Sequence, residues 1–321
     1  MKYYITADGG GTKQLVLLYD ETFKIVRSVR TAGTNSCFKP VGQITRETEE
    51  LADRLFADGL AETVKEIEAV DLCIVGDADI LIRALSRYVK LNSVNSWGEG
   101  STALGAAGVT YGCVAQAGTG SDAFLIQPDY TDVVGGWGAL LGDEGSGYDI
   151  GLQTLKAAVY AKDGRGPASR ILPILMEKWE MRGLWDLVGR TVNNPDARHL
   201  VASASYVAEL AADEGDETAL AIFERAGHAL ALQVNTVLAR HPGAPMGPII
   251  ASGGAWKGSS RMFGTFRDEV LAKHPACSVS YPIFEPVVGC MILRLLSEGK
   301  VFSDIEPVLR TEFHDFLYKH K

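Results

Sequence analysis

The stretch Asp8-Gly9-Gly10-Gly11-Thr12-Lys13 constrains the fold of this chain more than any other. An apolar, β-rich run (residues 3–7) precedes it and another (residues 15–19) follows it, so we expect a β-hairpin with the glycines at its tip. A tip without Cβ atoms lets backbone N–H groups approach an anion, and Thr12 and Lys13 add a hydroxyl and a cation. The pattern therefore predicts a phosphate-binding turn, although a tight hairpin without a ligand would give the same pattern.

A second turn of this kind lies further along the chain. Residues 112–117 lead into Gly118-Thr119-Gly120-Ser121, and residues 123–126 lead out of it. Two such turns that face each other can hold a polyphosphate from two sides, which one turn cannot do. Asp8, at the end of the first strand, is placed to hold a divalent cation through water. The duplication indicates a two-lobed phosphotransferase.

The composition limits the possible partners and the compartment. The 321 residues exceed one ordinary core, so we expect two domains. A net charge of −9 argues against nucleic acid or an anionic membrane as partner. The start has no signal-peptide pattern and no run could span a membrane, so we expect a cytoplasmic protein. The five cysteines are scattered and are interpreted as reduced thiols.

Between the two turns we expect mixed α/β structure. The spacing of apolar residues predicts a third strand over 25–30, helices over 42–57, 59–67 and 80–90, and a buried parallel strand over 69–75. Asn35 lies in a polar turn at the same end of the sheet as Asp8, where it is either a turn residue or a substrate contact. Asp77 and Asp79 follow the buried strand and are either ligand contacts or helix caps.

Glu99 directly precedes a predicted helix of small residues, 101–107. The partial positive charge at the start of that helix would stabilise its carboxylate and keep it ionised at neutral pH. Glu99 is thus a candidate base for a hydroxyl group, and an ordinary glutamate at a helix start is the alternative.

Two further glycine-rich segments are predicted to touch a ligand. Residues 135–147 are rich in glycine and also contain Trp137, Asp143 and Glu144. This composition indicates a loop pressed against a ligand rather than a helix or strand. A strand over 248–251 ends in Ser252-Gly253-Gly254-Ala255-Trp256-Lys257, a geometry that lets a flat ring lie on bare backbone, and we interpret it as the adenosine contact. Residues 168–240 are predicted to be largely helical scaffold, with Asp216 as the N-cap of a helix over 217–240.

In this order, these segments resemble the N-acetylglucosamine kinase and BadF/BadG/BcrA/BcrD ATPase-like family of the actin, Hsp70 and sugar-kinase superfamily. The resemblance covers the chain to about residue 299. It rests on the segments Asp8-Gly9-Gly10-Gly11-Thr12-Lys13, Gly118-Thr119-Gly120-Ser121, Gly135-Gly136-Trp137-Gly138, Gly142-Asp143-Glu144-Gly145-Ser146, Gly253-Gly254-Ala255-Trp256-Lys257 and Pro286-Val287-Val288-Gly289.

The resemblance implies an α/β fold of two ribonuclease-H-like, actin-like ATPase lobes with ATP and Mg²⁺ in the interdomain cleft. The lobes are expected over residues 1–112 and 113–299, followed by a tail helix on the surface within 300–321. Each implied role falls on a residue of this chain: sugar binding on Asn35, Gly136, Trp137 and Asp143; ATP binding on Gly10, Gly11, Thr12, Lys13, Gly118, Thr119, Gly120, Gly253, Gly254 and Trp256; the metal on Asp8; and the catalytic base on Glu99. The family's kinases usually carry Asp at the position of Glu99.

The sequence therefore predicts an ATP-dependent kinase that phosphorylates a hydroxyl, expected to be the 6-hydroxyl, of N-acetylglucosamine or a related amino sugar. Two alternatives remain: an ATPase that activates a partner protein, and a non-catalytic sugar or nucleotide sensor. The clustered cysteines of iron–sulfur dehydratase activators are absent from the sequence. We expect a small-molecule sugar and ATP as partners, and a homodimer is compatible with families of this kind.

Overall fold

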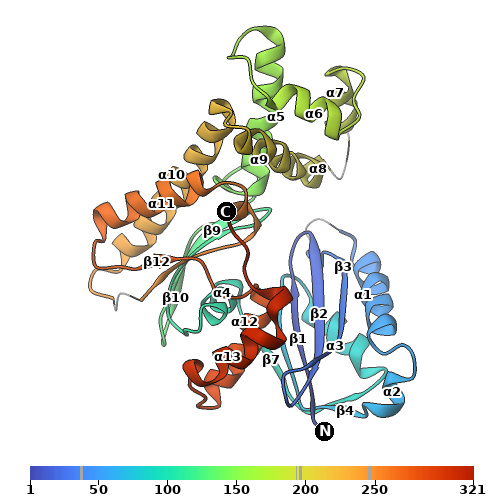
Figure 1. Ribbon diagram of the computed structural model, residues 1–321. Coiled ribbons are helices and arrows are strands. Elements are labelled where there is room, and N and C mark those ends of the chain that lie inside the picture. The colour runs from blue at the N-terminus through green and yellow to red at the C-terminus, as the bar shows by residue number, and fades with distance from the viewer. Residues whose placement is uncertain (37–38, 193, 195–196, 245–246) are drawn as a thin grey trace. The chain divides into compact units, whose positions relative to one another are not determined.

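Two five-stranded sheets of the same plan form the centre of the computed structural model, which describes residues 1–36, 39–192, 194, 197–244 and 247–321. The first has the strand order β3-β2-β1-β5-β7 and the second has the order β10-β9-β8-β11-β12 (Figure 1). In each sheet the first three strands are antiparallel, and the last two run parallel to the third. The chain thus contains the same mixed sheet twice.

The sheets belong to two compact units, each described here by itself. The first unit comprises Met1–Tyr111 and Pro282–Tyr318, and the second comprises Gly112–Tyr281 and Lys319–Lys321. The strands of the first sheet are β1 (Tyr3–Gly9), β2 (Lys13–Asp20), β3 (Ile25–Ala32), β5 (Ala69–Ile74) and β7 (Val94–Ser96). Those of the second are β8 (Gly112–Ala117), β9 (Ser121–Ile126), β10 (Thr131–Gly135), β11 (Ile249–Ser252) and β12 (Val279–Ser280).

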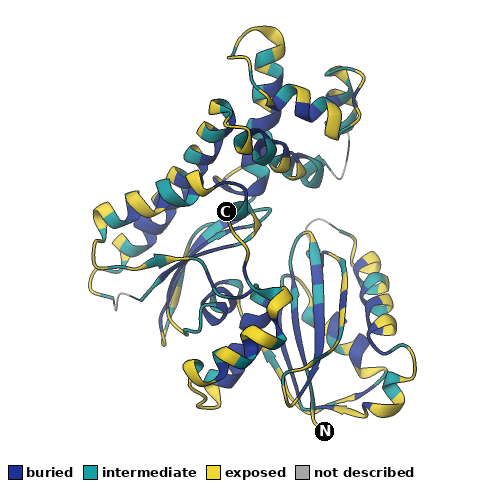
Figure 2. Cartoon of the chain, viewed as in Figure 1, coloured by how far each residue is buried: buried dark blue, intermediate teal, exposed yellow. Residues whose placement is uncertain are grey.

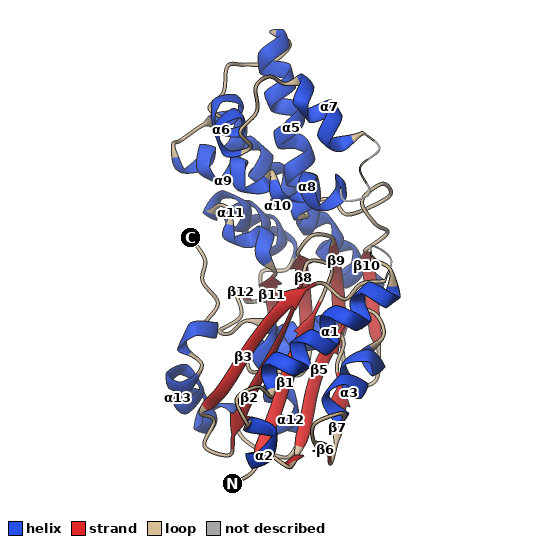
Figure 3. Ribbon diagram, turned by 90° about the vertical axis from the view of Figure 1, so that its right-hand side faces the viewer, coloured by secondary structure: helices blue, strands red, loops and turns tan. Residues whose placement is uncertain are grey.

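Helices cover both faces of the first sheet. They are α1 (Val41–Leu55), α2 (Leu60–Thr63), α3 (Ala78–Ser86), α4 (Glu99–Ala106), α12 (Pro286–Ser297) and α13 (Phe302–Glu312), with a 3₁₀ turn, η2 (His314–Phe316). Strand β2 alternates between the faces, because successive side chains of a strand point to opposite sides. Val16 and Leu18 lie in the core beneath α1 and α3, whereas Leu17 and Tyr19 lie in the core with α12 and α13. Figure 3 shows α1 and α3 side by side over the strands.

In the second unit a helical layer packs on the sheet. Its helices are α5 (Gly147–Asp163), α6 (Ile171–Lys178), α7 (Trp185–Thr191), α8 (Ala197–Ser203), α9 (Ser205–Asp213), α10 (Glu217–Arg240) and α11 (Ser260–Lys273), with a 3₁₀ turn, η1 (Gly254–Lys257). The apolar side of α10 packs against β8, β9 and β10. Figure 2 shows the inner strands of both sheets largely buried, while α10 and α11 are exposed along one side.

Most predicted elements are confirmed, including both glycine-tipped hairpins, the parallel strand β5 and the N-cap of α10, where Asp216 accepts a hydrogen bond from the amide of Ala219. The helix predicted over 59–67 is wrong beyond Thr63. The chain there turns extended, and β4 (Glu66–Ile67) pairs with β6 (Lys90–Leu91). The apolar spacing of that segment fits either structure, and pairing with β6 decides between them. Within the described residues no helix is long and apolar enough to cross a membrane.

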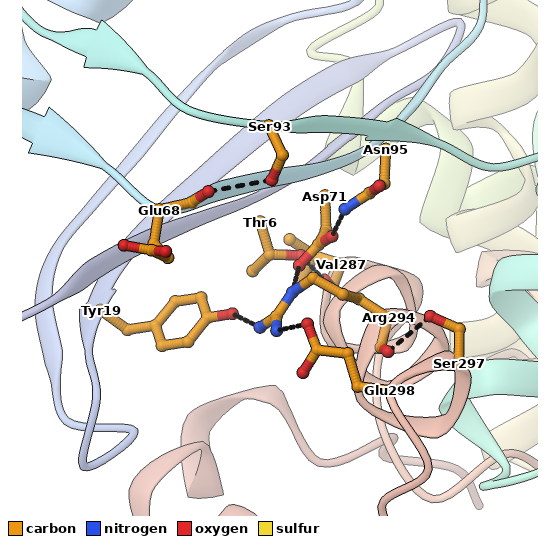
Figure 4. A network of polar contacts seen from close by, with 10 residues as sticks. All are labelled: Thr6, Tyr19, Glu68, Asp71, Ser93, Asn95, Val287, Arg294, Ser297 and Glu298. Atoms are coloured by element: carbon orange, nitrogen blue, oxygen red, sulfur yellow. Dashed lines mark hydrogen bonds and ion pairs between the residues drawn. The ribbon is translucent and has the colours of Figure 1, made fainter.

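The predicted boundary at residue 299 differs from the structure, because α12 and α13 belong to the first unit. Helix α12 packs on β1, β5 and α4, and its Arg294 makes an ion pair with Asp71 of β5 (Figure 4). The tail helix α13 is not only a surface element, since Ile305 and Leu309 are buried in the same core. The boundary was misplaced because these contacts join segments more than two hundred residues apart in sequence.

Candidate active site

The first glycine turn joins β1 to β2, and its backbone faces open space. A Cβ atom built on Gly10 or Gly11 would meet nothing within 4 Å. The loop after β3 lies against the inner side of this turn: the amide of Thr34 donates to the carbonyl of Gly10 at 2.9 Å, and a Cβ on Gly33 would lie 2.3 Å from the carbonyl oxygen of Gly11. The predicted phosphate turn and the loop that carries Asn35 are therefore one packed structure.

Asn35 is partly buried in that loop. The loop is also tied to the chain that follows β5, where Thr34 Oγ1 donates to the carbonyl of Val75 at 3.2 Å. Because β1 and β5 are parallel neighbours, the carboxyl ends of both strands meet at this loop. The structure thus brings Asn35 to the end of the sheet at which Asp8 lies.

The charges of two other carboxylates act on Asp8. Burial raises the pKa of the Asp8 carboxyl to about 6; Lys13 opposes this shift, and the charges of Glu99 and Glu285 add to it. Glu99 is the first residue of α4, and burial raises its pKa as well. The expectation that the helix start would hold Glu99 fully ionised thus omitted the larger effect of burial. Glu285, the N-cap residue of α12, is the other of these carboxylates, and the sequence reading missed it.

We expect Asp8→Asn to stabilise the cation-free protein at pH 8 by up to about 3 kcal/mol and to change little at pH 4. The folded-state pKa of Asp8 lies above its unfolded value, so its contribution to stability is complete below about pH 4 and is lost as the pH rises through 6. Urea unfolding with a chelator at both pH values measures the difference.

Asp20→Asn is the control with the opposite sign. Burial alone would raise the pKa of the Asp20 carboxyl. Hydrogen bonds from the Thr22 hydroxyl, the Thr22 amide and the Lys24 amide have the larger combined effect and lower it. The Asp20 carboxylate therefore stabilises the fold above about pH 4, and this stabilisation is lost on acidification. At pH 8, Asp20→Asn should be less stable than the wild-type protein. Equal effects of both variants would contradict the assignment of a raised pKa to Asp8.

The second glycine turn joins β8 to β9 in the second unit. The amide of Gly147 donates to the carbonyl of Gly118 at 2.8 Å, and Ser121 Oγ donates to the carbonyl of Glu144 at 2.8 Å. A Cβ on Gly120 would lie 3.1 Å from a carboxylate oxygen of Asp143. The turn is therefore in direct contact with the glycine-rich loop, and the sequence did not predict this contact.

The glycine-rich loop presents apolar side chains and buries an acid. Trp137, Leu140 and Leu141 are 76%, 92% and 74% exposed, whereas Asp143 is 5% exposed and pairs with Arg198 of α8. A positive φ at Gly136 and Gly138 lets the chain fold back between these residues. The predicted sugar contacts Gly136, Trp137 and Asp143 thus lie on one loop of the second unit, and Arg198 is a neighbour that the sequence reading missed.

Trp256 is predicted to bind ATP, but its side chain does not face open surface. Its side chain is fully buried in the core of the second unit, and its Nε1 donates to the carbonyl of Ala115 at 3.0 Å. Gly253 has a φ of +112° and lies against Ala117, while a Cβ on Gly254 would meet nothing within 4 Å. In this segment Gly254 is exposed, whereas Gly253, Ala255 and Lys257 are partly buried, so the bare backbone at Gly254 offers the most open surface for the predicted contact.

The donor set fits a hydrated cation better than a direct metal centre. No group of three or more His, Cys, Asp or Glu among the described residues is arranged to hold a metal. The partly buried carboxyl of Asp8 lies where the charges of Glu99 and Glu285 also act, and a cation bound through water would offset this negative charge. Cys73, Cys113, Cys277 and Cys290 are free thiols, and Cys37 lies outside the described residues.

A repeated mixed sheet with a glycine turn after the first strand of each copy defines the actin-like ATPase class of fold. Residues 7–293 match the BadF/BadG/BcrA/BcrD ATPase family, and the chain belongs to this family. This confirms the resemblance that the sequence motifs indicated.

Known relatives of the chain include two kinases. An N-acetylmuramic acid/N-acetylglucosamine kinase of Clostridium acetobutylicum is 28% identical over 256 residues, which cover 74% of this chain and 80% of the relative. An N-acetyl-D-glucosamine kinase of Dictyostelium discoideum is 24% identical over 326 residues, which cover 92% of this chain and 98% of the relative. The crystal structure of a proposed N-acetylglucosamine kinase from Chromobacterium violaceum superposes with a TM-score of 0.65 at 22% identity, covering 91% of this chain and 99% of that one. At this identity the structural likeness concerns the fold.

Proposed function

We propose that the protein is an ATP-dependent amino-sugar kinase that transfers the γ-phosphoryl group to the 6-hydroxyl of N-acetylglucosamine or a related hexosamine. The observation that carries this proposal is membership of an ATPase family together with two relatives, each matched over most of its length, that are named as kinases of such sugars. The side chains of Asn35, Glu99 and Asp143, of the types that such a reaction needs, support it.

In this proposal the glycine turns bind the phosphates. The turns at Gly10–Thr12 and Gly118–Gly120 offer backbone amides and hydroxyls to the phosphates, and Lys13 adds positive charge. Phosphoryl transfer depends mainly on positioning and charge stabilisation, so such cradles supply much of the catalysis. Gly254 presents bare backbone to the adenosine group.

Glu99 accepts the proton of the attacking hydroxyl. A carboxyl whose pKa burial has raised above its ordinary range is a better proton acceptor near neutral pH than a fully exposed one. Asn35 and Asp143 orient the sugar ring, with Gly136 and Trp137 beside it. Asp8 is the residue that would hold Mg²⁺ through water, and that ion would neutralise charge on the phosphates.

The experiment that tests the proposal is ADP release by the purified protein with ATP and Mg²⁺, with and without a panel of amino sugars and plain hexoses. We expect release to depend on an N-acetylated hexosamine and to be at least about tenfold slower without sugar. Release that no sugar changes would favour the partner-activating ATPase, and binding without release would favour the sensor.

A further inference from the structure

Arg198 and Asp143 form a largely buried ion pair that no sequence motif predicts. Arg198 Nη2 lies 2.8 Å from Asp143 Oδ2, and the two side chains are 19% and 4% exposed. Arg198 comes from α8 and Asp143 from the glycine-rich loop, 55 residues away in sequence. The pair therefore fastens the loop to the helical layer of the second unit at the residue that our proposed function assigns to the sugar.

The surroundings of Asp143 depend on this arginine. Burial raises the pKa of the Asp143 carboxyl; Arg198 opposes the shift most strongly, the amides of Ser121 and Gly138 oppose it too, and the charge of Glu144 adds to it. A carboxylate accepts about four hydrogen bonds, so Arg198 and two amides leave acceptor capacity for a ligand hydroxyl. Without Arg198, the group would hold its proton to higher pH and become a poorer acceptor.

The pair also lies against the second glycine turn. The Asp143 carboxylate fills the space beside Gly120, where a Cβ would come within 3.1 to 3.2 Å of its atoms. The turn therefore limits how far the Asp143 carboxylate can move towards Gly120.

We propose that Arg198 is a positioning residue for sugar recognition: it holds the Asp143 carboxylate ionised and aimed so that it accepts a hydrogen bond from a ring hydroxyl of the substrate. This inference rests on the proposed function, which assigns Asp143 to the sugar. Arg198 itself acts through Asp143.

The test uses the full-length protein and the variants Arg198→Met, Arg198→Lys and Arg225→Met. Arg225 pairs with Asp149 of α5, with side chains 48% and 14% exposed, and the Asp149 carboxylate also accepts a hydrogen bond from the amide of Gly145 at 3.0 Å. Arg225→Met is therefore a control for the loss of an arginine–aspartate pair beside the same loop that involves other residues than Asp143. Binding of N-acetylglucosamine in the presence of a non-hydrolysable ATP analogue is measured by calorimetry between pH 5 and 8, and KM for sugar and for ATP is measured alongside it.

We expect Arg198→Met to weaken sugar binding by about 10- to 100-fold, to change KM for ATP less than about threefold, and to move the acidic limb of sugar binding to higher pH. Arg198→Lys should recover part of the affinity because it restores the charge without the planar fork. Arg225→Met should leave sugar affinity and its pH profile unchanged.

Two failures are distinguishable. If the wild-type protein binds N-acetylglucosamine and Arg198→Met binds it equally well with the same pH profile, the positioning role is wrong while the proposed function stands. If the wild-type protein binds no amino sugar, the proposed function and this inference both fail. If Arg198→Met does not fold, Arg198→Lys is compared with the wild type, and an unchanged affinity for sugar in Arg198→Lys overturns the inference.

Discussion

Glu99→Gln should lower turnover with N-acetylglucosamine by about 100-fold or more while leaving the affinity for ATP within about twofold. Glutamine keeps the size and shape of the side chain but cannot accept the proton of the sugar hydroxyl. It also removes one of the charges that raise the pKa of Asp8, so the fold should be retained. Steady-state ADP release gives the turnover, and calorimetry with a non-hydrolysable analogue gives the ATP affinity.

Glu99→Asp is the matched control, because it keeps the carboxylate and shortens the side chain by one methylene. We expect it to retain turnover within about tenfold of the wild type if the shorter carboxylate still reaches the hydroxyl. The wild-type rate should fall on acidification through a pKa above the ordinary range of glutamate, since burial raises the pKa of Glu99 and the base must be ionised. Unchanged turnover in Glu99→Gln would remove Glu99 from the mechanism.

The glycine turns were predictable because their signal is local. A glycine run between two apolar, β-rich segments specifies a hairpin wherever the rest of the chain lies, and both β1–β2 and β8–β9 have this form. Glu99 could be placed at a helix start for the same reason. Its raised pKa could not be predicted, because burial depends on what the rest of the unit packs against it.

The residues that the sequence did not reveal are those that act over long separations. The charge of Glu285 acts on Asp8, although the two residues are far apart in sequence. Arg198, which pairs with Asp143, lies in a helix whose sequence has no distinctive pattern. Trp256 is the complementary case: the sequence places it beside two glycines, but the direction of its side chain, which points into the core, depends on tertiary packing. Local sequence predicted where the chain turns, and tertiary packing determined which side chains meet.

Arg294→Met should destabilise the first unit by about 3–5 kcal/mol. Arg294 is 7% exposed; its Nε lies 2.7 Å from Asp71 Oδ2, its Nη2 donates to the Tyr19 hydroxyl at 3.1 Å, and its Nη1 contacts Glu298 at 2.7 Å (Figure 4). Removing the guanidinium leaves the fully buried carboxyl of Asp71 with Asn95 as its remaining polar contact in this network. Urea unfolding followed by circular dichroism measures the loss.

A second variant and a control distinguish two causes of instability in Arg294→Met: the uncompensated charge of Asp71 and the loss of side-chain packing. Adding Asp71→Asn to Arg294→Met removes the uncompensated charge and should restore at least about half of the lost stability. Arg310→Met breaks the exposed pair with Glu306 on α13 of the same unit and should cost no more than about 1 kcal/mol. If Arg294→Met costs as little as Arg310→Met, the ion pair with Asp71 does not hold α12 to β5, and apolar packing in that core must attach the C-terminal helices alone.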